Sequence, residues 1–255
     1  MGIDRQLLFG TTAANQQNEQ ALSLRILNLE DGDARAVFRN LDFDMRLYKR
    51  LRMFTHCESA GATSEELQDG DLTVFIRLGS DYDQNYYEYQ KPLQVTEWGV
   101  SDQDKRLIWP EANEFDFALD ILKEVKLERN RAYRQSGDPI GVPYQVNRGG
   151  GEVTVVGQPN LGNVRTILIG VRNPKKRLAS DPDDGLSKSA EVWVNELRLT
   201  EFDQQGGWAA NARVAAKLAD FANVSLSGRT SSIGFGSLDQ SVSEFQQEEV
   251  FAYDF

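Results

Sequence analysis

Hydrophobic and polar residues alternate along most of this chain, as they do in β-strands that bury one face. The alternation is clearest in two stretches, where every second position is apolar: Leu41, Phe43, Met45 and Leu47, then Leu72, Val74, Ile76 and Leu78. Residues 164–171 are almost continuously apolar and β-branched, so we expect them to form a central strand of a sheet. With turns rich in glycine, asparagine and aspartate between such segments, the pattern predicts a mainly β fold, a β-sandwich.

One segment departs from this pattern and has helical spacing. Asn113 is a suitable N-cap, and acidic residues that favour the positive end of a helix follow it. Apolar residues then recur on one helical face, at Phe115, Leu119, Leu122 and Val125. We therefore expect one helix, from about residue 114 to residue 131, inserted between the strands.

The last quarter of the chain reads as an amphipathic β-hairpin. Apolar residues from Trp208 through Val214 to Leu218 alternate with polar ones, a turn follows at residues 220–223, and the alternation resumes. Such a face must be covered by protein or by lipid, and about 9–11 residues suffice for a membrane-spanning strand. Periodicity alone favours a two-stranded flap on a soluble β-sandwich, and a membrane-spanning strand is the alternative interpretation. We expect two parts, residues 1–200 and residues 201–255.

Composition and charge narrow the possible partners. The 255 residues carry a formal net charge of −11, which repels phosphate backbones and argues against nucleic acid as a ligand. The densest basic patch, residues 46–52, alternates with leucines and is better read as an exposed strand face. The single cysteine, Cys57, excludes a disulfide within the chain. No secretory signal is visible, and both ends look like cuts in a longer polypeptide.

Catalytic patterns are scarce. His56 and Cys57 are neighbours in an expected strand, so their side chains point to opposite faces and do not form a nucleophile–base pair. No phosphate-binding or dinucleotide motif is present, and we expect no enzyme activity and no organic cofactor. Calcium is the metal ion that the sequence suggests, because acidic pairs cluster in predicted turns. The candidate ligands are Asp69, Asp71, Asp81 and Asp83; acidic turns that merely face solvent are the alternative.

Aromatic residues offer a possible surface for a partner protein or a glycan. The segment 85–90 alternates aromatic and polar residues and is followed by Pro92, which places it near a sheet edge. The candidate platform comprises Tyr86, Tyr87, Tyr89, Trp98 and Trp109. Packing in a core or at a strand edge is the more common use of such residues.

Two segments resemble known jelly rolls. VRTILIGVRN (164–173) and AEVWVNELRL (190–199) are similar to the last two core strands of galactose-binding-like carbohydrate modules. This resemblance implies a jelly-roll β-sandwich, with the predicted helix inserted into it. Asn195 and Glu196 depart from the pattern of those modules.

A second resemblance covers most of the chain from about Ala34 onward. Seven short motifs occur in the order of the SprA/Sov family: FIRLGSD (75–81), NYYEY (85–89), WPEANEFD (109–116), ELRLTEFD (196–203), GGWAA (206–210), KLADFANV (217–224) and SIGFG (232–236). The family is the outer-membrane translocon of type IX secretion and gliding motility in Bacteroidetes. The resemblance implies an internal fragment of a very large β-barrel protein.

Several expectations follow from this second resemblance. Residues 1–200 would be an extramembrane domain that walls or caps the pore and docks other secretion-system subunits and cargo, on the extracellular side rather than the periplasmic one. Residues 201–255 would lie at the barrel wall or rim, with Trp208, Val214 and Leu218 facing lipid. A carbohydrate-binding module at the cell surface is the alternative, and an acidic glycoside hydrolase is a third hypothesis.

Overall fold

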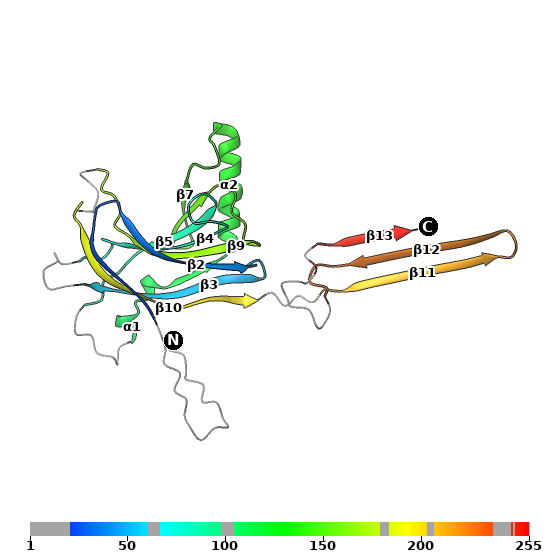
Figure 1. The fold of residues 1–255 in the computed structure, drawn as a ribbon, viewed down its shortest axis with the longest axis horizontal. Helices are drawn as coiled ribbons and strands as arrows, with labels where there is room; N and C mark the ends of the chain where they lie inside the picture. Colours follow the sequence, from blue (N-terminus) through cyan, green and yellow to red (C-terminus); the bar gives the residue numbers. More distant parts are fainter. Residues whose placement is uncertain are drawn as a thin grey trace, which may run out of the picture. The chain divides into compact units, whose positions relative to one another are not determined.

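The computed structural model describes residues 21–60, 67–97, 105–178, 184–202, 207–236, 246 and 248–254. The chain divides into two compact units, Met1–Phe202 and Asp203–Phe255, here named unit 1 and unit 2. Figure 1 shows unit 1 as packed strands with one long helix, and unit 2 as three strands side by side. The fold is mainly β with antiparallel sheets and one inserted helix, which confirms the predicted fold class.

Unit 1 consists of two antiparallel sheets. The four-stranded sheet has the order β1 (Leu22–Leu29), β10 (Lys188–Phe202), β3 (Tyr48–Ser59) and β6 (Phe115–Ala118). The six-stranded sheet has the order β2 (Ala34–Phe43), β9 (Val164–Arg172), β4 (Thr73–Gly79), β5 (Tyr86–Pro92), β8 (Gly151–Val156) and β7 (Tyr144–Arg148).

The strand pairing is that of a jelly roll. Without β7 and β8, unit 1 has eight strands among its described residues. These strands pair from the two ends of the sequence inward: β1 with β10, β2 with β9, β3 with β6 and β4 with β5. A long hairpin of four strand pairs folded over itself gives this pattern, and its pairs alternate between the two sheets. The helix and the hairpin β7–β8 are inserted between β6 and β9, where they widen the second sheet.

The core lies between the inner faces of the two sheets, as the alternation predicts. Val74, Ile76 and Leu78 of β4 are buried and face inward, and Val192 and Val194 of β10 face them from the other sheet. The strand predicted at residues 164–171 is β9, which lies between β2 and β4. Its predicted central position is confirmed.

The predicted start of the helix at residue 114 is wrong. Residues Glu111–Asn113 form a 3-10 turn, η1, Phe115–Ala118 form β6, and the long helix α2 covers Asp120–Ser136. Asn113 does not cap the helix, because its side-chain amide exchanges hydrogen bonds with the backbone of Gln94. The helix ends at Gly137, whose left-handed backbone conformation (φ +83°) closes the last turn. A further short helix, α1, covers Lys105–Ile108.

The packing of β6 explains why residues 115–118 are extended. Phe115 and Phe117 are both buried, and Asp116 between them points to the opposite face. There Asp116 bridges Arg50 and Arg52 of β3, at 2.6 Å and 2.5 Å. This cross-strand pairing requires an extended backbone, and it neutralises part of the basic patch of β3.

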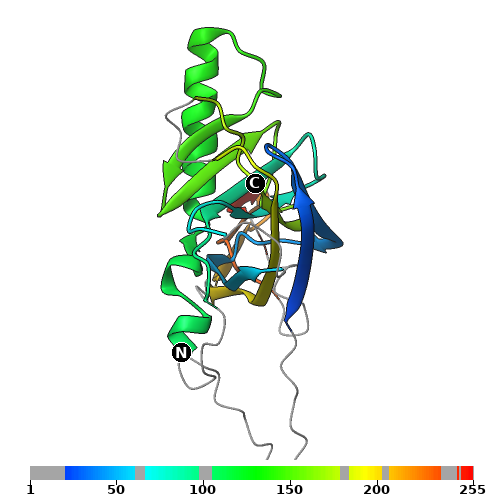
Figure 2. The ribbon, with the colours of Figure 1, turned by 90° about the vertical axis from the view of Figure 1, so that its left-hand side faces the viewer.

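The segment with alternating aromatic residues is not at an edge. It forms β5, which has β4 on one side and β8 on the other. The hairpin β7–β8, added after α2, extends the sheet beyond β5. Figure 2 shows α2 beside these added strands, and its buried residues Leu122 and Val125 lie in the same core as Val153 and Val155 of β8.

Unit 2 is an antiparallel sheet of β11 (Ala209–Leu218), β12 (Ala222–Ser231) and β13 (Val250–Asp254). The predicted hairpin is present, with Leu218 opposite Ala222 and a tight turn at residues 219–221. Among the residues that the structure describes, no helix combines the length and the apolar character needed to cross a membrane.

Candidate functional site

The outer face of the six-stranded sheet, which points away from the sandwich core, carries a buried carboxylate between two arginines. Glu88 of β5 is only 2 % exposed. Its Oε2 accepts hydrogen bonds from Arg77 of β4, at 2.6 Å and 3.0 Å, and its Oε1 accepts one from Arg172 of β9 at 2.9 Å. Glu88 lies directly opposite Arg77, whereas Arg172 lies further along β9 and reaches back to it.

Aromatic rings hold the two guanidinium groups in place. The Arg77 guanidinium lies 3.8 Å from the centre of the Tyr86 ring, and that of Arg172 lies 4.7 Å from the centre of the Phe75 ring. A planar guanidinium can stack on a ring while it donates to a carboxylate, so both interactions are satisfied together. Gly170 leaves the room for this layer, because a Cβ there would lie 2.6 Å from the Phe75 ring.

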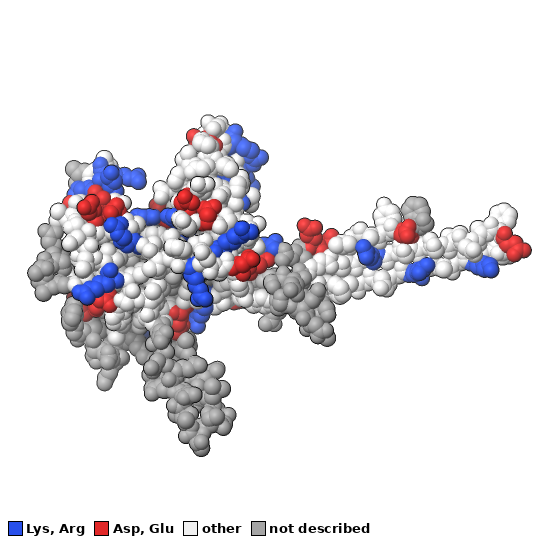
Figure 3. All heavy atoms as spheres, in the orientation of Figure 1, with Lys and Arg blue, Asp and Glu red and all other residues white. Residues whose placement is uncertain are grey.

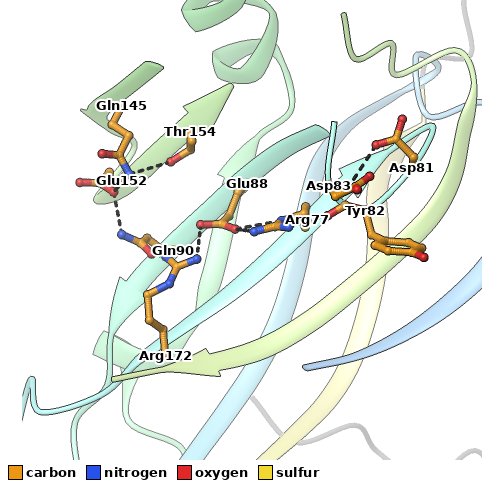
Figure 4. Close-up of polar contacts among 10 residues, drawn as sticks. All are labelled: Arg77, Asp81, Tyr82, Asp83, Glu88, Gln90, Gln145, Glu152, Thr154 and Arg172. Atoms are coloured by element: carbon orange, nitrogen blue, oxygen red, sulfur yellow. Dashed lines mark hydrogen bonds and ion pairs between the residues drawn. The ribbon is translucent and has the colours of Figure 1, made fainter. Parts of the chain in front are cut away.

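Hydrogen bonds extend this cluster across the sheet, as Figure 4 shows. Arg172 also donates to Gln90 of β5, whose amide donates to Glu152 of β8 at 2.6 Å. Gln145 of β7 donates to the same Glu152 oxygen at 3.3 Å and to Thr154 at 3.4 Å. The result is one pre-ordered polar surface, made of residues from β9, β4, β5, β8 and β7. We call it the outer-face network.

Two features border the outer-face network. At one end lies an open hollow of about 480 Å³, whose lining includes Gln90, Asn147 and Glu152. At the other end the Tyr82 carbonyl accepts a hydrogen bond from Arg77 at 2.5 Å, and the Tyr82 ring packs on Phe38 of β2 with ring centres 5.6 Å apart. Tyr82 and Phe38 are more than half exposed, so this aromatic pair is available to a partner.

Sequence reasoning missed the outer-face network. The polar residues Arg77, Glu88 and Gln90 alternate with apolar residues along their strands, and that signal was visible. The partnership of Glu88 with Arg172, 84 residues apart in the chain, was not visible, because it depends on the order of strands in the sheet.

Three of the four candidate calcium ligands, Asp69, Asp71 and Asp81, accept hydrogen bonds from other groups of the protein. Asp69 accepts a hydrogen bond from the Val95 N–H, and Asp71 accepts from Gln68 N–H and from Lys188, each at 2.9 Å. Asp69 and Asp71 precede β4 and Asp81 and Asp83 follow it, so the two pairs are separated by its seven residues, about 20 Å. They therefore do not converge on one ion.

Asp81 organises the turn between β4 and β5. Its Oδ1 accepts hydrogen bonds from the backbone N–H groups of Asp83, Gln84 and Asn85, and its Oδ2 accepts one from the Asn85 side chain at 2.8 Å. Burial opposes its ionisation, but these hydrogen bonds outweigh burial and hold the pKa of Asp81 below its ordinary value. Among the described residues, no three His, Cys, Asp or Glu side chains are grouped as a metal site requires.

Two members of the candidate aromatic platform are not at the surface. Tyr87 and Tyr89 point into the core and are at most 3 % exposed, which corrects their assignment to a partner surface. Their hydroxyls donate to the carbonyls of Pro159 and Gly149, and burial raises the pKa of each to about 12.

Of the other three members, the structure describes Tyr86 and Trp109, which lie at different sheets. Tyr86 lies on the outer face, next to Arg77, and is half-buried. Trp109 packs by the four-stranded sheet, against Phe54 and His56. Trp98 lies outside the described residues.

In unit 2 the three residues predicted to face lipid lie on one exposed face. Trp208, Val214 and Leu218 are 59 %, 63 % and 53 % exposed. The strand register places further exposed apolar side chains on the same face: Val224, Leu226, Phe251 and Tyr253. The opposite face is polar, with Asn211, Arg213 and Lys217 on β11 and Ser225, Ser227 and Arg229 on β12. We call the first the apolar face of unit 2.

Comparison with known proteins gives the family. The family model SprA_N, described as motility related/secretion protein, matches residues 1–255. No curated protein matches the chain significantly. The match covers the whole chain and agrees with the resemblance found in its motifs, so the chain belongs to the SprA_N family of motility related/secretion proteins.

Proposed function

We propose that this chain is part of the outer-membrane translocon of type IX secretion and gliding motility. In this proposal unit 2 contributes strands that cross the membrane, and unit 1 is a rigid extramembrane jelly roll that walls or caps the pore and docks partner proteins. The role is structural and binding rather than catalytic. The observation that carries the proposal is the apolar face of unit 2.

The apolar face of unit 2 is suited to lipid. Seven large apolar side chains stand on it, each at least half exposed, and the rest of that face is made mainly of alanine, glycine and threonine. An apolar face of this extent marks contact with a membrane or another protein. The outer strands β11 and β13 each have one neighbour among the described strands, so further strands can continue the sheet on both sides.

The length of the strands also supports this function. The ten residues of β11 extend about 34 Å, which becomes roughly 24 Å when the strand is tilted by about 45°. This matches the apolar band of about 25 Å in outer-membrane proteins. Trp208 precedes β11, and Phe221 follows it in the tight turn at 94 % exposure. Aromatic residues at both ends of the strand suit the two membrane interfaces.

The lengths of the connections support an extracellular location for unit 1. Only residues 219–221 join β11 to β12, whereas the 18 residues 232–249 separate β12 from β13. Outer-membrane proteins have short periplasmic turns and longer extracellular loops, so β11 starts at the extracellular surface. The six residues 203–208 link unit 1 to β11 and span at most about 22 Å, less than a hydrocarbon core of about 30 Å. They are too short to cross it.

A pair of arginine substitutions in the full-length protein tests the membrane role. Val214 is in the middle of β11 on the apolar face, and Ala215 is its neighbour on the polar face. Arginine on the lipid side near the membrane centre costs about 2–4 kcal/mol. Val214→Arg should therefore reduce the amount of folded protein in the outer membrane, and Ala215→Arg should not. Equal effects of the two substitutions would contradict the proposal.

The docking role rests on the rigidity and polarity of the outer-face network. Its side chains are fixed by ion pairs and hydrogen bonds before a partner binds, so little conformational entropy is lost on association. Deletion of unit 1 from the full-length protein should impair secretion or loosen a partner subunit while the membrane part still assembles. Normal secretion and unchanged co-purification of partners would argue against this role.

Glycan binding at the same surface is a second candidate. The hollow next to the outer-face network exposes the amide and carboxyl groups of Gln90, Asn147 and Glu152, which can bind sugar hydroxyls. Titration of the chain with a glycan array, with Glu152→Ala as the variant, would separate this function from protein docking. Binding that Glu152→Ala abolishes would favour the glycan.

A further inference from the structure

The polar face of unit 2 carries a row of basic side chains. Arg213 and Lys217 lie on β11 and Arg229 lies on β12, and we call these three residues the basic row. The register places Arg213 opposite Ser227, Lys217 opposite Asn223 and Arg229 opposite Asn211. The apolar residues occupy the alternate positions, so all three cations are on the face away from Val214 and Leu218.

The three cations of the basic row outnumber the carboxylates that the strands of unit 2 place on the same face. Within β11, β12 and β13 the one carboxylate is that of Asp254, which lies on the same face, opposite Ser227 and diagonal to Arg229. Two strand spacings, about 10 Å, separate the backbones of Arg213 and Asp254. This face is therefore net positive in a chain whose net charge is −11. Figure 3 shows unit 2 as a mostly uncharged surface with isolated charged side chains.

The geometry of the basic row suits carboxylates. Arg213 and Arg229 are diagonal neighbours, about 7–8 Å apart at their backbones. Lys217 is four residues along β11, about 13 Å from Arg213. An open hollow of about 550 Å³ lies on the sheet, and its lining includes Arg213, Arg229, the hydrogen-bonding side chains of Asn211 and Ser227, and one carboxylate, Asp254. Guanidinium groups bind carboxylates through paired hydrogen bonds.

We propose that the basic row recognises acidic segments of polypeptide. This inference rests on the proposed function, because a sheet with lipid on its apolar face has its polar face toward the water-filled interior through which cargo passes. An extended run of four to six residues spans about 13–20 Å, the length over which the three cations are spread. We therefore expect this face to bind cargo segments rich in Asp and Glu. The attraction between opposite charges also raises the rate at which such a segment associates with the face.

The test measures binding of a fluorescein-labelled octaglutamate peptide to the full chain in detergent micelles, by fluorescence anisotropy at low salt. The variant Arg213→Gln, Lys217→Gln, Arg229→Gln should weaken binding on the order of tenfold. The control variant Lys123→Gln, Arg131→Gln, Arg134→Gln removes the same charge from the exposed side of α2 and should bind like the unmodified chain. Salt of about 0.5 M should remove the difference, because it screens exposed charges.

Each result decides the inference. Equal losses in the two triple variants would show that total charge alone governs binding and would overturn it, as would unchanged binding in the basic-row variant. Circular dichroism of the variant shows whether its strands are intact. The arginine substitutions at residues 214 and 215 test the membrane role separately, so failure of the basic row with a confirmed membrane strand would refute this inference alone.

Discussion

Replacing Glu88 with glutamine should destabilise unit 1 strongly. The change removes the buried negative charge and leaves Arg77 and Arg172 facing each other, with side chains that are only 18 % and 25 % exposed. Breaking a buried ion pair by removing one partner costs about 3–5 kcal/mol. The two arginines retain some contact with water, so we expect the lower end, about 3 kcal/mol.

The assay is urea unfolding and thermal unfolding of the full chain, with hydrogen exchange of the β4, β5 and β9 amides to assign the change to unit 1. A loss of about 3 kcal/mol lowers the melting temperature of a unit of this size by roughly 6–12 °C. The matched control is Glu128→Gln, which breaks an ion pair with Arg148 whose side chains are more than 40 % exposed. That pair contributes at most about 1 kcal/mol.

A double substitution tests the cause of the Glu88 effect. Arg172→Met removes one of the two cations left unpaired by Glu88→Gln. If the lost charge is the cause, the two substitutions together cost less than the sum of their separate effects, by about 1 kcal/mol or more. A Glu88→Gln variant as stable as the Glu128→Gln variant would refute the reasoning, because the buried carboxylate would then have no role in stability.

Three further predictions concern unit 1. The hydrogen bond from Arg52 lowers the pKa of Asp116, so the stability lost in Asp116→Asn should be constant above about pH 4 and vanish as the pH falls through the lowered pKa, as urea unfolding would show; a constant difference down to pH 2 would contradict this. Calcium or EDTA should leave the melting temperature unchanged, because the oxygens of Asp81 already accept hydrogen bonds; a clear rise with calcium would contradict this. Gly170→Ala should destabilise by about 1–3 kcal/mol in the same unfolding assay, because its methyl group meets the Phe75 ring; an unchanged unfolding midpoint would argue against that contact.

The strands were predictable from the sequence because each has one buried face. Alternation located β4 and the hairpin β11–β12, and the apolar run at residues 164–171 located β9. The same approach failed at β6, because Phe115 lies four residues before Leu119 and so fits a helical face by coincidence. Only the pairing of Asp116 with β3 shows that the segment is extended.

The candidate site was harder to predict than the fold. The outer-face network joins residues from five strands, and their order in the sheet follows from pairings between distant segments, such as β2 with β9. The acidic turn residues were ambiguous because aspartate is used both to bind calcium and to accept backbone hydrogen bonds in turns. Asp81 does the second. The three apolar residues of unit 2 were placed on one face correctly, since that requires only a period of two.

Lipid accessibility along β11 tests the account most directly. Single spin labels at residues 210–217 of the full-length protein in membranes, with other cysteines replaced, would be measured for their collisions with oxygen and with a water-soluble nickel complex. We predict alternation with a period of two: labels at Val214 and its even-numbered neighbours meet oxygen, and labels at Arg213 and its odd-numbered neighbours meet nickel. Uniform exposure to nickel at every position would contradict a membrane-spanning strand.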